Sequence, residues 1–101
     1  MNRVAITGMG AITPIGNDIN TVYESLKNGV CGVGKITRFD PVDLKVHVAA
    51  EVKDFDPENF GISKGDARRM DVYCQYAMAA AAQAMEDSGI DGTVAPERFG
   101  V

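Results

Sequence analysis

The stretch RVAITGMGAITPIG, residues 3–16, carries more structural information than any other part of the chain. Residues 4–7 form a short apolar run with β-branched side chains, and this run opens directly into Gly8 and Gly10. The pattern predicts a buried β-strand that ends in a glycine-rich turn. Pro14 has no amide hydrogen to donate to a sheet, so regular strand pairing is expected to end before it.

A helix is predicted immediately after this turn. Asn17 and Asp18 are both residue types that cap the amino-terminal ends of helices. The apolar residues that follow recur at the i, i+3, i+4 and i+7 spacing of one helical face. They are Ile19, Val22, Tyr23 and Leu26. Gly29 is suited to end the helix in the left-handed conformation.

The middle of the chain has a weaker pattern. Gly29, Gly32 and Gly34 indicate a loop, and the Phe-Asp-Pro sequence at residues 39–41 indicates a turn. Residues 46–52 predict a strand. Residues 55–58 predict a short helical turn with Pro57 at its first position.

A long helix is predicted near the end of the chain. Ser63 and Asp66 have the spacing of a capping box in its less usual aspartate form, and residues 67–88 are nearly all good helix formers. Gly89 supplies the stop. The helix is apolar on most sides, so we expect it to be buried among several neighbours. Four alanines at residues 79–82 would let another helix approach closely. Residues 98–101 predict the start of a further strand, and the chain is expected to be incomplete.

Composition excludes several classes of function. A length of 101 residues suits one small domain, and 46% hydrophobic with 24% charged residues is ordinary for a folded protein. The net charge of −4 gives no general attraction to nucleic acid or anionic lipid, so neither partner is expected. The first residues do not predict a signal peptide, and the sequence contains no span of about 20 apolar residues. We therefore expect a cytoplasmic protein with reduced thiols.

No catalytic, cofactor-binding or metal site is predicted from the cysteines and the histidine. Cys31 and Cys74 lie outside any C-x-x-C pair, and His47 is close in sequence to neither. A zinc site needs three or four ligands at suitable spacing. A reactive thiolate needs a base or a positive field nearby. We interpret Cys74 as a small buried apolar residue, Cys31 as an inert loop thiol and His47 as structural.

The glycine-rich turn also admits a dinucleotide-binding interpretation. The G-x-G-x-x-G fingerprint needs its third glycine at position 13, where the chain has Thr13. Pro14 also stands where the phosphate-binding helix should already be running. The sequence therefore favours a structural turn, whose glycines permit close packing.

Lys64, Arg68 and Arg69 gather three cations at the start of the long predicted helix. Lys64 and Arg68 are four residues apart and would share a face, with Arg69 about 100° around the helix. One interpretation is a solvated first turn in which Arg68 pairs with Asp71. The other is a binding site for an acidic partner.

Residues 3–16 resemble the opening of elongating β-ketoacyl-acyl-carrier-protein synthases, the ketosynthases of fatty acid and polyketide assembly. Four further segments agree with that family in order and spacing. They are residues 36–40 (ITRFD), 49–55 (AAEVKDF), 68–71 (RRMD) and 84–89 (AMEDSG). The resemblance extends over the whole chain and is closest to the type II enzyme.

The resemblance implies an α/β, thiolase-like fold, in which two related halves make a five-layered α-β-α-β-α arrangement, usually as a homodimer. Residues 1–101 would be the amino-terminal portion of the first half. The implied activity is decarboxylative condensation of an acyl thioester with malonyl-acyl-carrier protein in fatty acid biosynthesis. The catalytic cysteine of the family lies downstream, and neither Cys31 nor Cys74 matches its position. The segment alone is therefore expected to be inactive, with no cofactor.

The resemblance also implies a partner for the basic residues. In this family, basic residues at this helix start help to dock the acidic acyl carrier protein, and Lys64, Arg68 and Arg69 match them. Gly65 stands where relatives often carry a further basic residue. Two other functions stay open: a non-catalytic ketosynthase-like subunit (a chain-length factor) and a small nucleotide-binding α/β module, which Thr13 and Pro14 disfavour.

Overall fold

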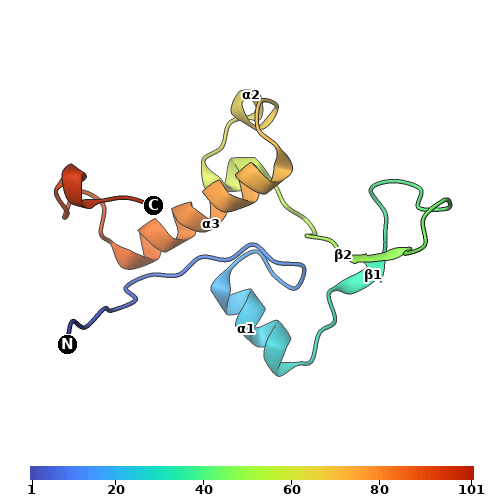
Figure 1. The fold of residues 1–101 in the computed structure, drawn as a ribbon, viewed down its shortest axis with the longest axis horizontal. Helices are drawn as coiled ribbons and strands as arrows, with labels where there is room; N and C mark the ends of the chain where they lie inside the picture. Colours follow the sequence, from blue (N-terminus) through green and yellow to red (C-terminus); the bar gives the residue numbers. More distant parts are fainter. The chain divides into compact units, whose positions relative to one another are not determined.

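The computed structural model describes all of residues 1–101 (Figure 1). Its elements in chain order are α1 (Ile19–Lys27), β1 (Val33–Lys35), β2 (Val48–Ala50), the 3-10 helix η1 (Pro57–Phe60), α2 (Lys64–Ala67), α3 (Val72–Ser88) and the 3-10 helix η2 (Pro96–Arg98). The chain divides into two compact units, residues 11–56 and residues 1–10 with 57–101. None of the helices combines the length and apolar character that crossing a bilayer requires.

The unit of residues 11–56 begins with a tight turn that leads into α1. The amide of Thr13 donates to the Gly16 carbonyl at 2.8 Å, and the Gly16 amide donates to the Thr13 carbonyl at 3.2 Å. Asp18 caps α1, because its carboxylate accepts from the Thr21 amide at 2.8 Å and the Thr21 hydroxyl at 2.9 Å. These hydrogen bonds lower the pKa of Asp18. Gly29 follows the helix with a φ of 64°, so the predicted cap and stop are both confirmed.

A two-stranded antiparallel ribbon completes this unit. Val33 pairs with Ala50 and Lys35 with Val48. The predicted strand at residues 46–52 is confirmed over β2, whereas the loop predicted around Gly34 is wrong, because β1 forms there. Beyond the ribbon, the Glu51 carboxylate accepts from the Thr37 hydroxyl at 2.8 Å and the Thr37 amide at 3.1 Å. Hydrogen bonds from Thr37 lower the pKa of Glu51. They also connect the segment after β1 to the segment after β2.

In the second unit, the long helix predicted to begin at the Ser63 cap and to run to residue 88 is interrupted. Ser63 does cap a helix, since its Oγ accepts from the Asp66 amide at 3.1 Å, but α2 ends at Ala67. A new helix, α3, starts after Asp71, whose ψ of 152° is extended. The Nε2 of Gln75 donates to the carbonyls of Ala67 at 2.9 Å and Met70 at 3.3 Å. The break is therefore stabilised because a side chain takes the place of backbone donors that a continuous helix would have supplied.

Two of three further predictions for the second unit agree with the structure. Gly89 caps α3 with a φ of 60°, which confirms the predicted stop. The strand predicted at residues 98–101 is wrong: Arg98 belongs to η2, and Phe99, although extended at φ −108° and ψ 125°, has no strand partner. The predicted helical turn at Pro57 is confirmed as η1.

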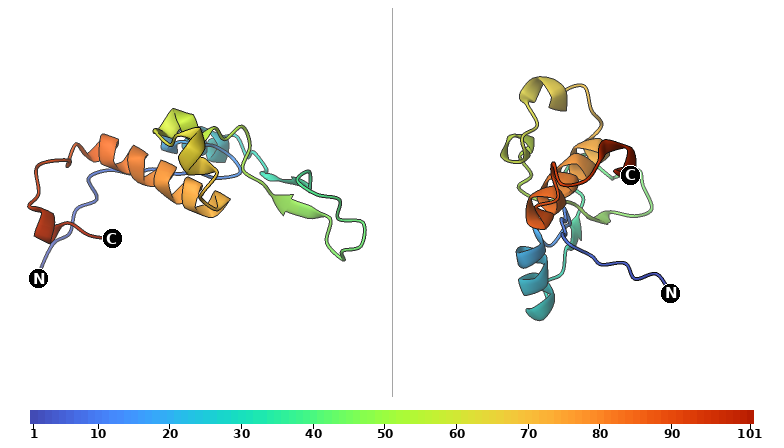
Figure 2. Two further views of the ribbon diagram at one scale, coloured as in Figure 1. Left: turned by 90° about the horizontal axis from the view of Figure 1, so that it is seen from above. Right: turned by 90° about the vertical axis from the view of Figure 1, so that its left-hand side faces the viewer.

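The amino-terminal segment is not the buried strand that residues 4–7 predict. No strand lies beside it to accept its hydrogen bonds, and Val4 and Ile6 are 94% and 83% exposed. Instead, residues 8–10 run alongside α3 (Figures 1 and 2), and the Met9 amide donates to the Asp87 carboxylate at 2.9 Å. The segment of residues 8–10 thus packs against the small alanine side chains of α3, where we expected a neighbouring helix.

Residues 1–101 do not supply the several neighbours that the apolar surface of α3 predicts. Ala79 is fully buried, but Tyr73 is 72% and Met78 53% exposed. Besides Ala79, the only buried residue of the whole chain is Ile62. The helix packs against η1 and the amino-terminal segment, and these cover only part of its apolar surface.

Replacing Gly10 by alanine is expected to lower the free energy of unfolding by about 1–3 kcal/mol, the usual cost of overpacking. The added Cβ would overlap the Ala80 carbonyl, and helical backbone cannot rotate away as a flexible side chain can. Gly34→Ala is the matched control, because a Cβ there meets nothing within 4 Å. The free energy of unfolding is measured by denaturant titration of the full-length protein that contains residues 1–101. Equal stability of the two variants would contradict the close packing.

Candidate functional site

The three predicted basic residues, called the basic group below, lie at and just beyond α2. Lys64 is the first residue of α2, Arg68 is its carboxy-terminal cap and Arg69 follows in the turn before α3. The amide of Arg68 donates to the Lys64 carbonyl at 3.2 Å and that of Arg69 to the Asp66 carbonyl at 2.9 Å. The expected placement along one long helix is therefore corrected: Lys64 is helical, and the two arginines project from the turn that follows.

The side chains of the basic group are exposed. The Nζ of Lys64 lies 3.6 Å from the Glu58 Oε2, and the Lys64 side chain remains 75% exposed. Neither arginine takes part in an ion pair, so the pairing of Arg68 with Asp71 does not form. Two guanidinium groups are thus available to carboxylates of a partner, which they can bind with two parallel hydrogen bonds each.

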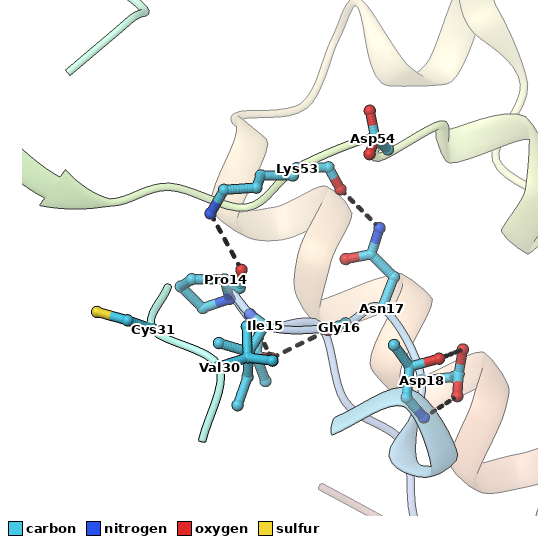
Figure 3. A pocket seen from close by; sticks show the side chains of 11 residues that line it. Pro14, Ile15, Gly16, Asn17, Asp18, Val30, Cys31, Lys53 and Asp54 are labelled. Atoms are coloured by element: carbon cyan, nitrogen blue, oxygen red, sulfur yellow. Dashed lines mark hydrogen bonds between the residues drawn. The ribbon is translucent and has the colours of Figure 1, made fainter. Parts of the chain in front are cut away.

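A second candidate is the cavity beside the turn of residues 13–16, with a volume of about 390 Å³. Figure 3 shows its wall: the turn, the start of α1, and the side chains of Cys31, Lys53 and Asp54. The Lys53 ammonium is turned toward the Pro14 carbonyl, to which it donates at 3.1 Å. No feature of the sequence singled out Lys53, because its partners are backbone carbonyls, which every residue type provides.

The cysteines and the histidine do not form a catalytic pair. Cys31 is exposed, and its thiol reaches the Val33 carbonyl only at 3.9 Å. The Nε2 of His47 lies 2.7 Å from the Leu44 carbonyl, which is a local contact within the ribbon loop. Cys74 is half-buried at the start of α3, and its neighbouring thiol raises the pKa of Tyr73. No three metal-binding side chains gather anywhere in the structure.

The glycine-rich turn serves packing in this structure. A Cβ at Gly8 or Gly10 would overlap the backbone of α3. The Met9 amide between them already donates to the Asp87 carboxylate, and a negative charge at that point repels phosphate. The glycines thus fit the structural interpretation better than dinucleotide binding.

Comparison with known proteins identifies the class of the chain. The family "Beta-ketoacyl synthase, N-terminal domain" matches residues 1–101, so the chain belongs to this family. Its structure also resembles "The ishigamide ketosynthase/chain length factor", with a TM-score of 0.74 and 34% sequence identity, over 94% of this chain and 22% of that one. The resemblance inferred from residues 3–16 is thereby confirmed, and the solved structure that this chain resembles is named as a ketosynthase.

Its relatives carry a more particular name. The "3-oxoacyl-[acyl-carrier-protein] synthase 2" of Staphylococcus aureus (strain COL) is 51% identical over 89 residues, which are 88% of this chain and 21% of the relative. The protein of the same name from Synechocystis sp. is 45% identical over 86 residues, 85% of this chain and 20% of the relative. The chain therefore spans about one fifth of the length of these relatives.

Proposed function

We propose that residues 1–101 form the amino-terminal portion of the first half of a ketosynthase domain in a 3-oxoacyl-acyl-carrier-protein synthase. The whole protein would condense an acyl thioester with malonyl-acyl-carrier protein, with loss of CO₂, in fatty acid biosynthesis. It would be a cytoplasmic homodimer with the thiolase-like α-β-α-β-α arrangement. The observation that carries this proposal is the 51% identity over 89 residues with the Staphylococcus aureus synthase.

Within that protein, the role of this chain is recognition and scaffolding. Cys31 and Cys74 have no general base beside them, so neither is suited to accept an acyl group. The basic group is suited to dock the acidic acyl carrier protein, because its side chains are exposed and both arginines lack an intramolecular ion pair. The segment would therefore bind the protein that delivers the substrate, while the reacting groups come from elsewhere in the polypeptide.

A chain-length factor is the second candidate function. It is favoured by the similarity to the ishigamide protein, whose name joins a ketosynthase with a chain length factor. The residue at the family's nucleophile position separates the two. A cysteine at a strand–helix elbow downstream of Val101 supports the enzyme, and another residue there supports the factor.

Grafting tests whether this segment can serve in a condensing enzyme. Residues 1–101 replace the matching segment of the Staphylococcus aureus synthase, and the Synechocystis segment, which is 45% identical to this chain, provides a matched control graft. We expect this graft to keep kcat/KM within about tenfold of the parent, a change of about 1.4 kcal/mol in activation free energy. A folded graft without activity, beside an active control graft, would contradict the proposal.

A further inference from the structure

The ammonium of Lys53 joins three segments of the unit of residues 11–56. It donates to the carbonyl oxygens of Pro14 at 3.1 Å, Gly32 at 3.2 Å and Glu51 at 3.1 Å. A lysine ammonium has three N–H donors, so these three carbonyls use all of them. The Lys53 carbonyl in turn accepts from the Nδ2 of Asn17 at 2.9 Å (Figure 3). Lys53 is thus bound to the turn, to the loop before β1 and to the chain after β2.

Three backbone carbonyls that converge on one positive charge resemble a receptor for a cation. Rings of carbonyl oxygens replace the hydration shell of potassium in channel filters. The observed distances of 3.1–3.2 Å exceed those at which oxygen ligands hold Mg²⁺, about 2.0–2.1 Å, or Ca²⁺, about 2.3–2.6 Å. The spacing therefore fits a large monovalent cation and is too wide for a divalent one.

Gly32 makes the convergence possible. A Cβ at this position would lie 2.8 Å from the Pro14 Cβ and 2.9 Å from the Ile15 Cγ2, which is closer than such atoms can approach. The absence of a side chain lets the loop approach the turn closely enough for the Gly32 and Pro14 carbonyls to reach the same ammonium. The cavity of about 390 Å³ lies beside this junction.

We propose that the carbonyls of Pro14, Gly32 and Glu51 form a monovalent-cation site that Lys53 fills with its own ammonium. This tethered cation is a positioning group: it holds the turn of residues 13–16 against the loop of residues 30–32. Removal of the ammonium leaves three carbonyls directed at an empty position. A free methylammonium or potassium ion then has the charge and size to replace it.

Amine labelling tests whether the ammonium is engaged. With a limiting acetylating ester, Lys53 is expected to react at least about tenfold more slowly than Lys35 and Lys45, a ratio equivalent to about 1.4 kcal/mol. All three lysines are exposed, but only Lys53 donates hydrogen bonds through its ammonium group, so Lys35 and Lys45 are internal references. The label on each lysine is measured by mass spectrometry in the folded graft. Equal rates for the three lysines in the folded graft would overturn the proposal.

Chemical rescue tests the cation site itself. In Lys53→Ala, the amide hydrogens of residues 13–17 and 30–34 are expected to exchange about tenfold faster, because the two segments separate more often. Methylammonium or potassium chloride should slow this exchange again. Tetramethylammonium chloride at the same ionic strength should not, because it is larger and has no N–H donor.

Two further variants complete the test. Lys53→Met keeps the length of the side chain but fills the site without a hydrogen-bond donor. The amides of residues 13–17 and 30–34 should therefore exchange faster in this variant, and neither methylammonium nor potassium should slow them. Lys45→Ala removes an exposed lysine and should leave exchange unchanged. Rescue of Lys53→Met, or no rescue of Lys53→Ala by either ion, would rule out the cation site. Both readouts are independent of condensing activity, so their outcome is distinct from that of the proposed function.

Discussion

Expressed alone, residues 1–101 are expected to self-associate and to lack a cooperative thermal transition. Only Ile62 and Ala79 are buried, whereas many large apolar side chains are exposed on both units. Each large side chain that becomes buried in an interface contributes about 1.5–3 kcal/mol, so a few such contacts outweigh the entropy lost on association. Light scattering coupled to gel filtration measures the mass at several concentrations, and calorimetry measures the transition.

Exposed residues of α3 provide a matched pair of variants for this prediction. Tyr73→Ser with Met78→Ser removes two apolar side chains that are 72% and 53% exposed, and should reduce the oligomeric fraction severalfold. Lys45→Ser, an exposed polar position, should leave it unchanged. A monodisperse monomer of the wild-type chain with a cooperative transition would show instead that residues 1–101 are a self-sufficient domain.

The elements that sequence reasoning predicted well are those set by neighbouring residues. Asp18 caps α1 through Thr21, three residues away, and Gly89 stops α3 with its own left-handed backbone. Strands depend instead on partners that are distant in sequence. Residues 4–7 have the composition of a strand but find no partner, while Gly34 lies in β1 because Ala49 pairs with it.

In the candidate sites, too, features set by neighbouring residues were predicted and contacts with distant backbone were not. Residue type and spacing predict the basic group, and its docking role stays a prediction. The break between α2 and α3 was missed, because it depends on the side-chain amide of Gln75 donating back to the Ala67 carbonyl. Lys53 gave no signal, since the carbonyls of Pro14, Gly32 and Glu51 carry no sequence information. Contacts of side chains with distant backbone are thus the part of this structure that pattern analysis could not supply.

The second large effect is expected for the basic group in the proposed full-length 3-oxoacyl-acyl-carrier-protein synthase. Arg68→Glu or Arg69→Glu is expected to raise the apparent KM for acyl-carrier protein by an order of magnitude or more. A pair of charges about 4 Å apart in water interacts with about 1 kcal/mol, and a reversal replaces attraction with repulsion, so about 2 kcal/mol is lost per pair. Both side chains are exposed and free of ion pairs, so the fold should lose little stability, about 0–1 kcal/mol at most.

Salt dependence and a small substrate distinguish docking from damage to the active site. Because screening acts over about 8 Å at physiological ionic strength, the KM of the wild type should rise with salt and that of each variant should rise less. Pantetheine thioesters lack the acidic protein, so turnover of these substrates should change little. Lys45→Glu makes the same charge change in the ribbon loop and is the matched control. Equal losses on protein-bound and free thioesters would mean that the arginines support the fold or the active site, and the docking role would have to be abandoned.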